Sequence, residues 1–135
     1  MPASLRWIAL LLAFAIVATP ISLAVQRVQT ARTTRATAEA LTHGDVDLGR
    51  IAIVRHGCGA CHQIDGIAGA QGRVGSSLKG VATRVELAGR TPNAPASLQR
   101  LVRHPQEVIP GVGMPDMGIG EQEGRDIAAY LYTLR

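Results

Sequence analysis

Hydrophobic and polar positions divide the chain into three stretches. Residues 7–25 form an apolar run of 19 positions without a charged side chain, interrupted only by Pro20. Residues 26–43 are rich in Gln, Thr, Ala and Arg and hold almost no large apolar side chain, which is typical of an exposed spacer. From residue 44 onward, apolar positions recur at helical spacing. The pattern predicts an N-terminal segment over residues 1–25, a linker over 26–43 and one compact domain over 44–135.

The N-terminal run has two interpretations. Its length is close to the roughly 20 residues that cross a bilayer as a helix, which favours an uncleaved transmembrane anchor. Alternatively, it is a signal peptide with its hydrophobic stretch at residues 8–17 and cleavage after Ser22-Leu23-Ala24, which fits the small-x-small rule. Neither interpretation leaves a cytoplasmic protein.

The compact domain is predicted to be all-α, with three helices and no strand. The first helix begins near Val46 with Asp45 as its N-cap, the second lies between Pro95 and Pro105, and the third covers about residues 121–134. Glycine-rich residues 63–93 are predicted to form loops. The apolar faces are assigned to Leu48, Ile51 and Ala52 in the first helix, Leu98, Leu101 and Val102 in the second, and Ile127, Tyr130, Leu131 and Leu134 in the third.

Five consecutive residues, Cys58-Gly59-Ala60-Cys61-His62, indicate the chemistry of the domain. The pattern C-x-x-C-H is the attachment signature of c-type haem. Two intervening residues on one helical turn place both thiols along the porphyrin edge, where they become thioethers. The adjacent imidazole then lies beneath the iron as an axial ligand. These are the only two cysteines of the chain, so the sequence predicts one covalently attached haem c.

Two other uses of the cysteines remain as alternatives. A redox dithiol of the thioredoxin kind requires a βαβ setting, and the chain has no strand-helix-strand pattern. A zinc site requires a second pair of ligands at comparable spacing, and His43, His56 and His104 do not supply one.

The distribution of charge along the chain argues against a nucleic-acid partner. The formal net charge is +4, but residues 44–135 hold ten Lys and Arg side chains against nine Asp and Glu, a balance of +1. Two haem propionates would bring the domain near or below zero. The excess of positive charge lies in the linker, where Arg27, Arg32 and Arg35 can bind anionic lipid headgroups. Without a basic face or an aromatic platform, no nucleic-acid partner is expected.

The same arginines bear on the orientation in the membrane. By the positive-inside rule they would place the C-terminal side of the run in the cytoplasm. Proteins with the C-x-x-C-H motif receive their haem on the outer face of the inner membrane, and the charge bias is only statistical. We therefore expect an inner-membrane protein whose haem domain faces the periplasm or outer side.

Residues along the whole domain carry a resemblance to a known family. They are Gly49-Arg50, residues 57–62, Gly72-Arg73-Val74-Gly75, Asn93, Arg103-His104-Pro105-Gln106, Met114-Pro115-Asp116-Met117-Gly118 and residues 126–131. From residue 44 to the end, the chain resembles a class I cytochrome c, in particular the small membrane-anchored bacterial mono-haem type and the cytochrome domains associated with terminal oxidases. The resemblance implies a small helical domain around one covalent haem, preceded here by an N-terminal transmembrane helix. Its first and last helices should cross at Gly49, with Tyr130 packed over it.

The resemblance also implies the second axial ligand of the iron, a methionine on a loop before the last helix. Met114 is followed by Pro115, as in the family, and is the expected ligand; Met117 is the alternative. Two positions depart from the family. Ser76 stands where a proline usually offers the carbonyl that orients the proximal histidine, His62. Leu101 stands where related domains often have a tryptophan near a propionate, a role for which Arg73, Arg100 and Arg103 are candidates.

The expected function follows from a closed iron site. An iron with two protein ligands has no exchangeable position, so the resemblance implies a one-electron carrier in a membrane respiratory chain rather than an enzyme, with no small-molecule substrate. The expected partners are membrane-bound redox proteins, an oxidase or dehydrogenase complex. The competing class is an open-site haem enzyme or a gas or redox sensor, which requires that Met114 be absent from the iron or easily displaced. A structural subunit of a larger complex is a third possibility.

Overall fold

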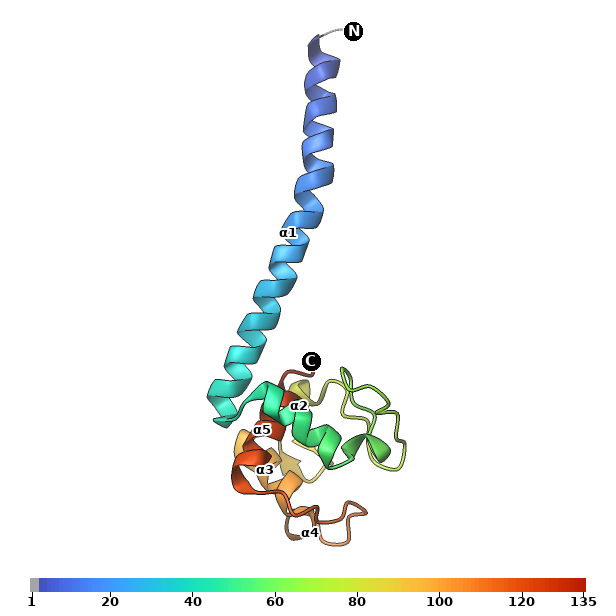
Figure 1. Ribbon diagram of the computed structural model, residues 1–135, viewed down its shortest axis with the longest axis vertical. Coiled ribbons are helices and arrows are strands. Elements are labelled where there is room, and N and C mark those ends of the chain that lie inside the picture. Colours follow the sequence, from blue (N-terminus) through green and yellow to red (C-terminus); the bar gives the residue numbers. More distant parts are fainter. Residues whose placement is uncertain (1–2) are drawn as a thin grey trace. The chain divides into compact units, whose positions relative to one another are not determined.

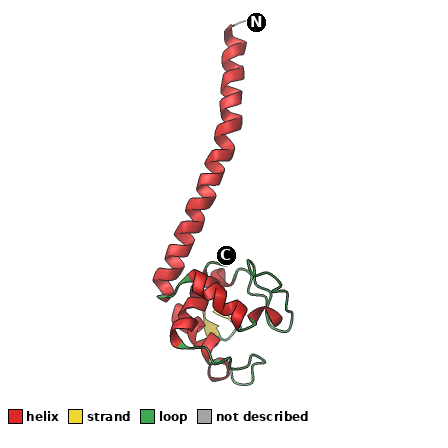
Figure 2. Ribbon diagram, in the orientation of Figure 1, coloured by secondary structure: helices red, strands yellow, loops and turns green. Residues whose placement is uncertain are grey.

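The computed structural model describes residues 3–135. It divides into two compact units, with the boundary between Thr34 and Arg35. Helices dominate both units, as the pattern of apolar positions predicts (Figures 1 and 2). The elements are α1 (Ala3–Thr42), α2 (Val46–Arg55), the 3-10 turns η1 (Cys58–Ala60) and η2 (Val81–Thr83), strands β1 (Glu86–Leu87) and β2 (Thr91–Pro92), α3 (Pro95–Arg103), α4 (Pro105–Val108) and α5 (Glu121–Tyr132).

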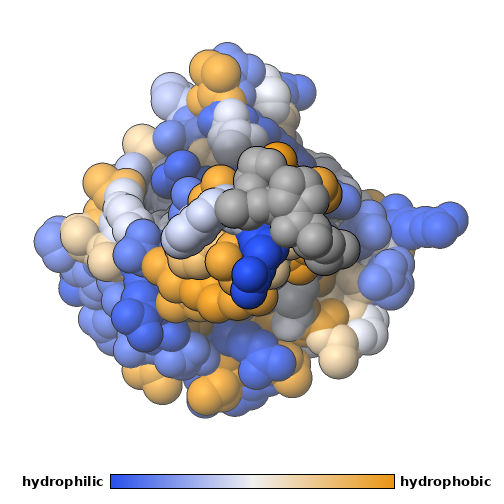
Figure 3. Space-filling view, turned by 90° about the horizontal axis from the view of Figure 1, so that it is seen from above, coloured by the Kyte–Doolittle hydropathy of each residue, from blue (hydrophilic) through white to orange (hydrophobic). Residues whose placement is uncertain are grey.

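Helix α1 is continuous over 40 residues and contains Pro20 in its interior. Its large apolar side chains, among them Trp7, Phe14 and Ile16, are exposed. The space-filling view from above looks down α1 from its N-terminal end and shows hydrophobic side chains in orange (Figure 3). It is the one helix among the described residues that is long and apolar enough to cross a membrane, and a signal sequence would pass the same test.

Helices α2 and α5 pack against each other at Gly49, and Gly44, which lies just before α2, also touches α5. A side-chain carbon at Gly49 would overlap the backbone of Asp126, and one at Gly44 would overlap the carbonyl of Arg125. The close approach expected at Gly49 is therefore present. The atoms nearest to Gly49 belong to the backbone of Asp126 and Ile127. Tyr130, which was expected over Gly49, donates a hydrogen bond from its hydroxyl to the carbonyl of Asp65 at 2.8 Å.

The apolar face assigned to the first helix of the domain is wrong at two positions. Leu48 and Ile51 are more than half exposed, and the face of α2 that packs on α5 consists of Val46, Gly49, Ala52 and Ile53. The reason is steric, because only the glycine allows the two backbones to touch. Gly49 therefore has to face α5, and this orientation turns Leu48 and Ile51 toward solvent.

The remaining differences from the predicted elements are small. Strands β1 and β2 form a two-residue antiparallel ladder that pairs Glu86 with Pro92 and Leu87 with Thr91. They are too short to carry an alternating pattern, which is why the sequence does not reveal them. The last helix ends at Tyr132, two residues before the predicted Leu134.

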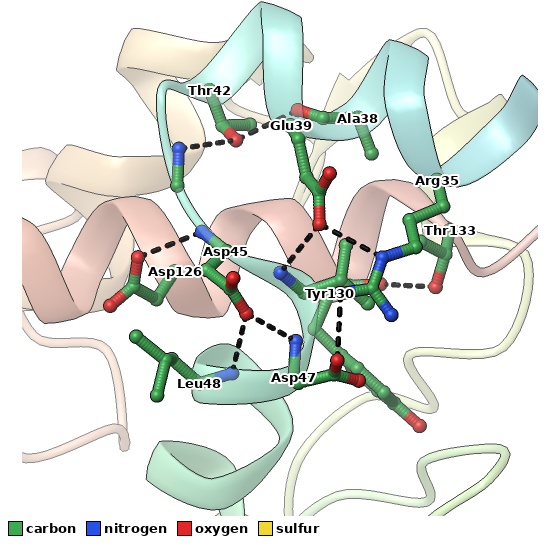
Figure 4. A network of polar contacts seen from close by, with 12 residues as sticks. Arg35, Ala38, Glu39, Thr42, Asp45, Asp47, Leu48, Asp126, Tyr130 and Thr133 are labelled. Carbon is green, nitrogen blue, oxygen red and sulfur yellow. Dashed lines mark hydrogen bonds and ion pairs between the residues drawn. The ribbon is translucent and has the colours of Figure 1, made fainter. Parts of the chain in front are cut away.

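The last two turns of α1 belong to the unit that holds the rest of the chain. Residues 35–43, expected to lie in an exposed linker, are helical up to Thr42, and the side chains of Ala38 and Thr42 are 2% and 0% exposed. Polar contacts fix this end of the helix (Figure 4). Arg35 donates to Asp47 at 2.7 Å, and Gln99 donates to the carbonyl of Thr42 at 3.0 Å.

The charges at this junction respond to pH in a defined direction. The hydrogen bond from Arg35 lowers the pKa of the Asp47 carboxyl, and the same contact raises the pKa of the Arg35 guanidinium. A carboxyl whose pKa is lower in the folded state than in the unfolded state stabilises the fold at pH values above its unfolded-state pKa. This stabilisation is lost as the pH falls through the folded-state pKa. Both groups are exposed, so the effect is small and screened by salt.

A charge placed under this helix end is expected to destabilise the domain. Ala38→Glu buries a carboxylate in the apolar core, which we expect to lower the free energy of unfolding by about 3 kcal/mol. Ala40→Glu is the matched control, because Ala40 lies on the same helix but is exposed. Denaturant unfolding of the full chain in detergent measures both. Equal stability of the two variants would contradict the docking of residues 35–42.

Candidate functional site

The C-x-x-C-H motif begins where α2 ends. Helix α2 stops at Arg55, and Gly57 adopts a left-handed conformation with φ of 66° that starts the turn η1. The amide of His62 then donates to the carbonyl of Cys58 at 2.9 Å, and the amide of Cys61 donates to the same carbonyl at 3.2 Å. The two cysteines and the histidine therefore lie on one turn of backbone, as the motif spacing predicts.

Neither cysteine takes part in a disulfide. Cys58 is half-buried and packs against the hydrophobic core, and Cys61 is exposed. Burial raises the pKa of the Cys58 thiol above its ordinary value. Redox-active dithiols instead depend on a lowered thiol pKa, so this environment does not favour the dithiol alternative.

The imidazole of His62 is oriented by the segment that follows. Its Nδ1 lies 2.7 Å from the carbonyl oxygen of Ser76, the hydrogen bond that the resemblance implies at this position. A carbonyl can only accept, so Nδ1 carries the proton, and the lone pair of the neutral ring is on Nε2. The serine preserves the contact although it lacks the stiffness of proline. His62 therefore offers Nε2 as a free metal ligand.

Gly75 determines how closely this segment approaches the histidine. A side-chain carbon at Gly75 would overlap the imidazole ring of His62. The amide of Gly75 also donates to the carbonyl of Cys61 at 2.8 Å, which ties the segment to the motif. The glycine therefore lets the backbone lie against the ring face and restrict its rotation.

Small residues also line the contact between η1 and the loop at residues 69–72. A side-chain carbon at Gly59 would overlap Ala70, and one at Gly72 would overlap the carbonyl of Ala60. The amide of Gly72 donates to the carbonyl of Gly59 at 3.1 Å. Ala70 lies in this loop, which we expected beside the porphyrin edge, and is 1% exposed. Its small side chain next to glycines is the only signal in the sequence for this contact.

Met114 lies on a separate loop between α4 and α5. It is partly buried, and Pro115 and Met117 next to it are exposed. This loop and the loops around η1 extend to the same side of α5 in Figure 1. No hydrogen bond among the described residues joins the Met114 loop to the C-x-x-C-H turn. The structure therefore groups Cys58, Cys61 and His62 directly and supplies Met114 from a second segment.

The other histidines have different surroundings. His43 follows α1 in a left-handed conformation, Nε2 of His56 lies 3.0 Å from the carboxylate of Glu123, and Nδ1 of His104 lies 3.8 Å from that of Asp116. Within residues 3–135, no group of three or more His, Cys, Asp or Glu side chains is placed to hold a metal ion. The described part of the chain thus offers no zinc site of that kind.

Comparison with known proteins identifies the family. The model of the Cytochrome c family matches residues 46–135, which is more than half of the chain. No curated protein and no solved structure matches the chain. Two cysteine thiols on one turn, outside any disulfide, and an imidazole with its Nδ1 bonded to a carbonyl are the donor set that covalent haem attachment requires. The chain therefore belongs to the cytochrome c family, as a class I c-type cytochrome whose cofactor is covalently attached haem c.

Proposed function

We propose that this cytochrome is a mono-haem carrier that passes single electrons between membrane-bound proteins of a respiratory chain. The haem supplies the one-electron redox chemistry, and the protein supplies its ligands, its burial and a docking surface. The observation that carries the proposal is the environment of His62. Its Nδ1 is bonded to Ser76 and its ring lies against Gly75, so Nε2 is held in one orientation for the iron.

Cys58 and Cys61 are the proposed attachment points of the haem, and Met114 is the proposed second axial ligand. A thioether is neutral and soft, so it favours ferrous iron and raises the reduction potential. Met114 is partly buried on its loop, whereas Met117 is exposed, which supports Met114 over the alternative. With both axial positions filled by protein, the iron has no site for a substrate.

The porphyrin edge is the proposed point of electron entry and exit. We place it among η1, the loop at residues 69–72 and the Met114 loop. Ala60 and Gly69 in this region are exposed, and their side chains are too short to separate a partner from the edge. The near-neutral charge of the domain predicts only modest electrostatic steering of the partner.

The membrane context is proposed from α1. We propose that its apolar part is an uncleaved anchor in the inner membrane and that the haem domain faces the periplasm. Anchoring confines the carrier near its partners, an oxidase or a dehydrogenase complex, which raises their local concentration without a strong docking contact.

The test is the covalent state of the haem. We expect the parent protein to retain one haem through acid extraction and denaturing mass spectrometry, and Cys58→Ala/Cys61→Ala to retain none. We also expect the double variant to lack native circular dichroism, because a domain of this size buries too little surface without the porphyrin. Cys58→Ala and Cys61→Ala alone serve as controls that each keep one attachment point. Loss of haem from the parent would refute the proposed attachment.

A further inference from the structure

Gln106 makes three hydrogen bonds to the segment that carries Met114. It lies in the short helix α4 and is exposed. Its Nε2 donates to the carbonyl of Val112 at 2.6 Å and to that of Met114 at 2.9 Å. Its Oε1 accepts from the amide of Gly111 at 3.2 Å. The amide group thus uses both donor hydrogens and one acceptor on a single loop.

The loop has few other polar contacts to hold it. Among the described residues, no backbone-to-backbone hydrogen bond involves residues 113–119. Gly111 and Gly118 adopt left-handed conformations, and a side-chain carbon at Gly113 would meet no atom within 4 Å. Glycines of this kind leave the backbone free to move unless another contact restrains it. Within residues 3–135, the bond from Gln106 is the only hydrogen bond that reaches the backbone of Met114.

We infer that Gln106 is a positioning residue that keeps Met114 on the haem iron. The inference rests on the proposed ligation by Met114. A ligand on an unrestrained loop loses conformational freedom each time it binds, and a loop that is already ordered avoids much of that cost. Gln106 orders the carbonyls on both sides of the methionine, so Met114 would compete better with an external ligand for the iron. The exposed position of Gln106 on α4 means that this role is separate from core packing.

The variants Gln106→Glu and Gln106→Leu test this role. Glutamate keeps the size and the acceptor for Gly111, but its carboxylate faces the carbonyls of Val112 and Met114 without a donor. Leucine removes all three bonds. The matched control is Gln122→Leu, because Gln122 also uses its Nε2 for two bonds, to the carbonyl of His43 and the carboxylate of Asp126, and neither of these partners belongs to the Met114 loop.

The readouts are imidazole binding to the ferric holoprotein and the near-infrared band that reports sulfur bound to ferric iron. Both Gln106 variants should bind imidazole on the order of tenfold more tightly than the parent, because the competing Met114 is held by fewer hydrogen bonds. The near-infrared band should weaken in the same variants. Gln122→Leu should lower stability yet leave the imidazole affinity and the band unchanged.

The outcomes separate this inference from the proposed function. If the parent lacks the near-infrared band, the ligation by Met114 fails, and the role of Gln106 fails with it. If the parent has the band and the Gln106 variants keep the parent affinity for imidazole, only the role of Gln106 is overturned. An equal rise in imidazole affinity for Gln122→Leu would also overturn it, because the effect would then reflect general loosening of the domain.

Discussion

Met114→Leu is expected to lower the reduction potential of this cytochrome by more than about 100 mV, a fraction of the roughly 0.8 V range that haem axial ligands span. Leucine has nearly the volume of methionine, so the loop should keep its packing. It has no sulfur to donate to iron, so the ferrous state loses the ligand that favours it. A redox titration followed by optical spectra measures the change, and the ferric variant should also lose the near-infrared sulfur band.

Met117→Leu is the control for this prediction. Met117 lies on the same loop and is 37% exposed, so its replacement makes the same chemical change at a site with no proposed contact to iron. We expect its potential and spectrum to match the parent. If Met117→Leu lowers the potential and Met114→Leu does not, the two methionines have been assigned the wrong way round.

Gly49→Ala is expected to lower the free energy of unfolding by about 3 kcal/mol. The added carbon would overlap the backbone of Asp126, and a backbone cannot rotate aside as a side chain can. Helices α2 and α5 would have to separate along the contact that holds the domain together. The gain in helix propensity on replacing glycine with alanine, about 1 kcal/mol, offsets only part of this. Denaturant unfolding of the holoprotein measures the difference.

Gly124→Ala provides the comparison within α5. The carbon added at Gly124 would meet the Cδ and Cγ atoms of Arg103, which belong to a long side chain with other rotamers available. We expect a change within about 1 kcal/mol, because the helix propensity gained balances the displacement of Arg103. Equal destabilisation by the two variants would mean that the crossing at Gly49 is less restrictive than the structure indicates.

Local signals in the sequence predicted most of the domain. Asp45 caps α2 by accepting from the amides of Asp47 and Leu48, and Pro95 starts α3, as expected. The C-x-x-C-H spacing predicted a single turn that joins Cys58, Cys61 and His62. These features depend on neighbours in the chain, which a sequence displays directly.

Contacts between distant segments were predicted only where the resemblance implied them, as at the crossing of Gly49 with the last helix and at the carbonyl of Ser76. The buried face of α2 is set by the approach of Gly49 to α5, and nothing in residues 46–55 alone indicates that partner. The docking of residues 35–42 rests on Ala38, Thr42 and polar contacts, which produce no hydrophobic pattern. The contacts of Gln106 were missed for the same reason, because an exposed amide gives no sequence signal for the backbone groups it bonds.

These features share a physical role around the candidate site. Gly75 and Ser76 restrict His62 from one segment, and Gln106 restrains the Met114 loop from another. The hydrogen bonds in both cases involve backbone carbonyls, of Ser76 and of Val112 and Met114, which any residue supplies. The proposed ligands and, through the resemblance, the carbonyl of Ser76 are readable from the sequence, whereas the roles of Gly75 and Gln106 become visible only in the folded chain.

Exposure of the ferrous parent protein to carbon monoxide decides whether both axial positions of the iron are filled by the protein. A carrier with His62 and Met114 on the iron has no open position, so the account predicts an optical spectrum that stays unchanged after the gas is added. Prompt formation of a carbon monoxide complex at full occupancy would contradict the account. The second axial position of the iron would then be open, or filled only by a weakly bound ligand, as in a haem enzyme or a gas sensor.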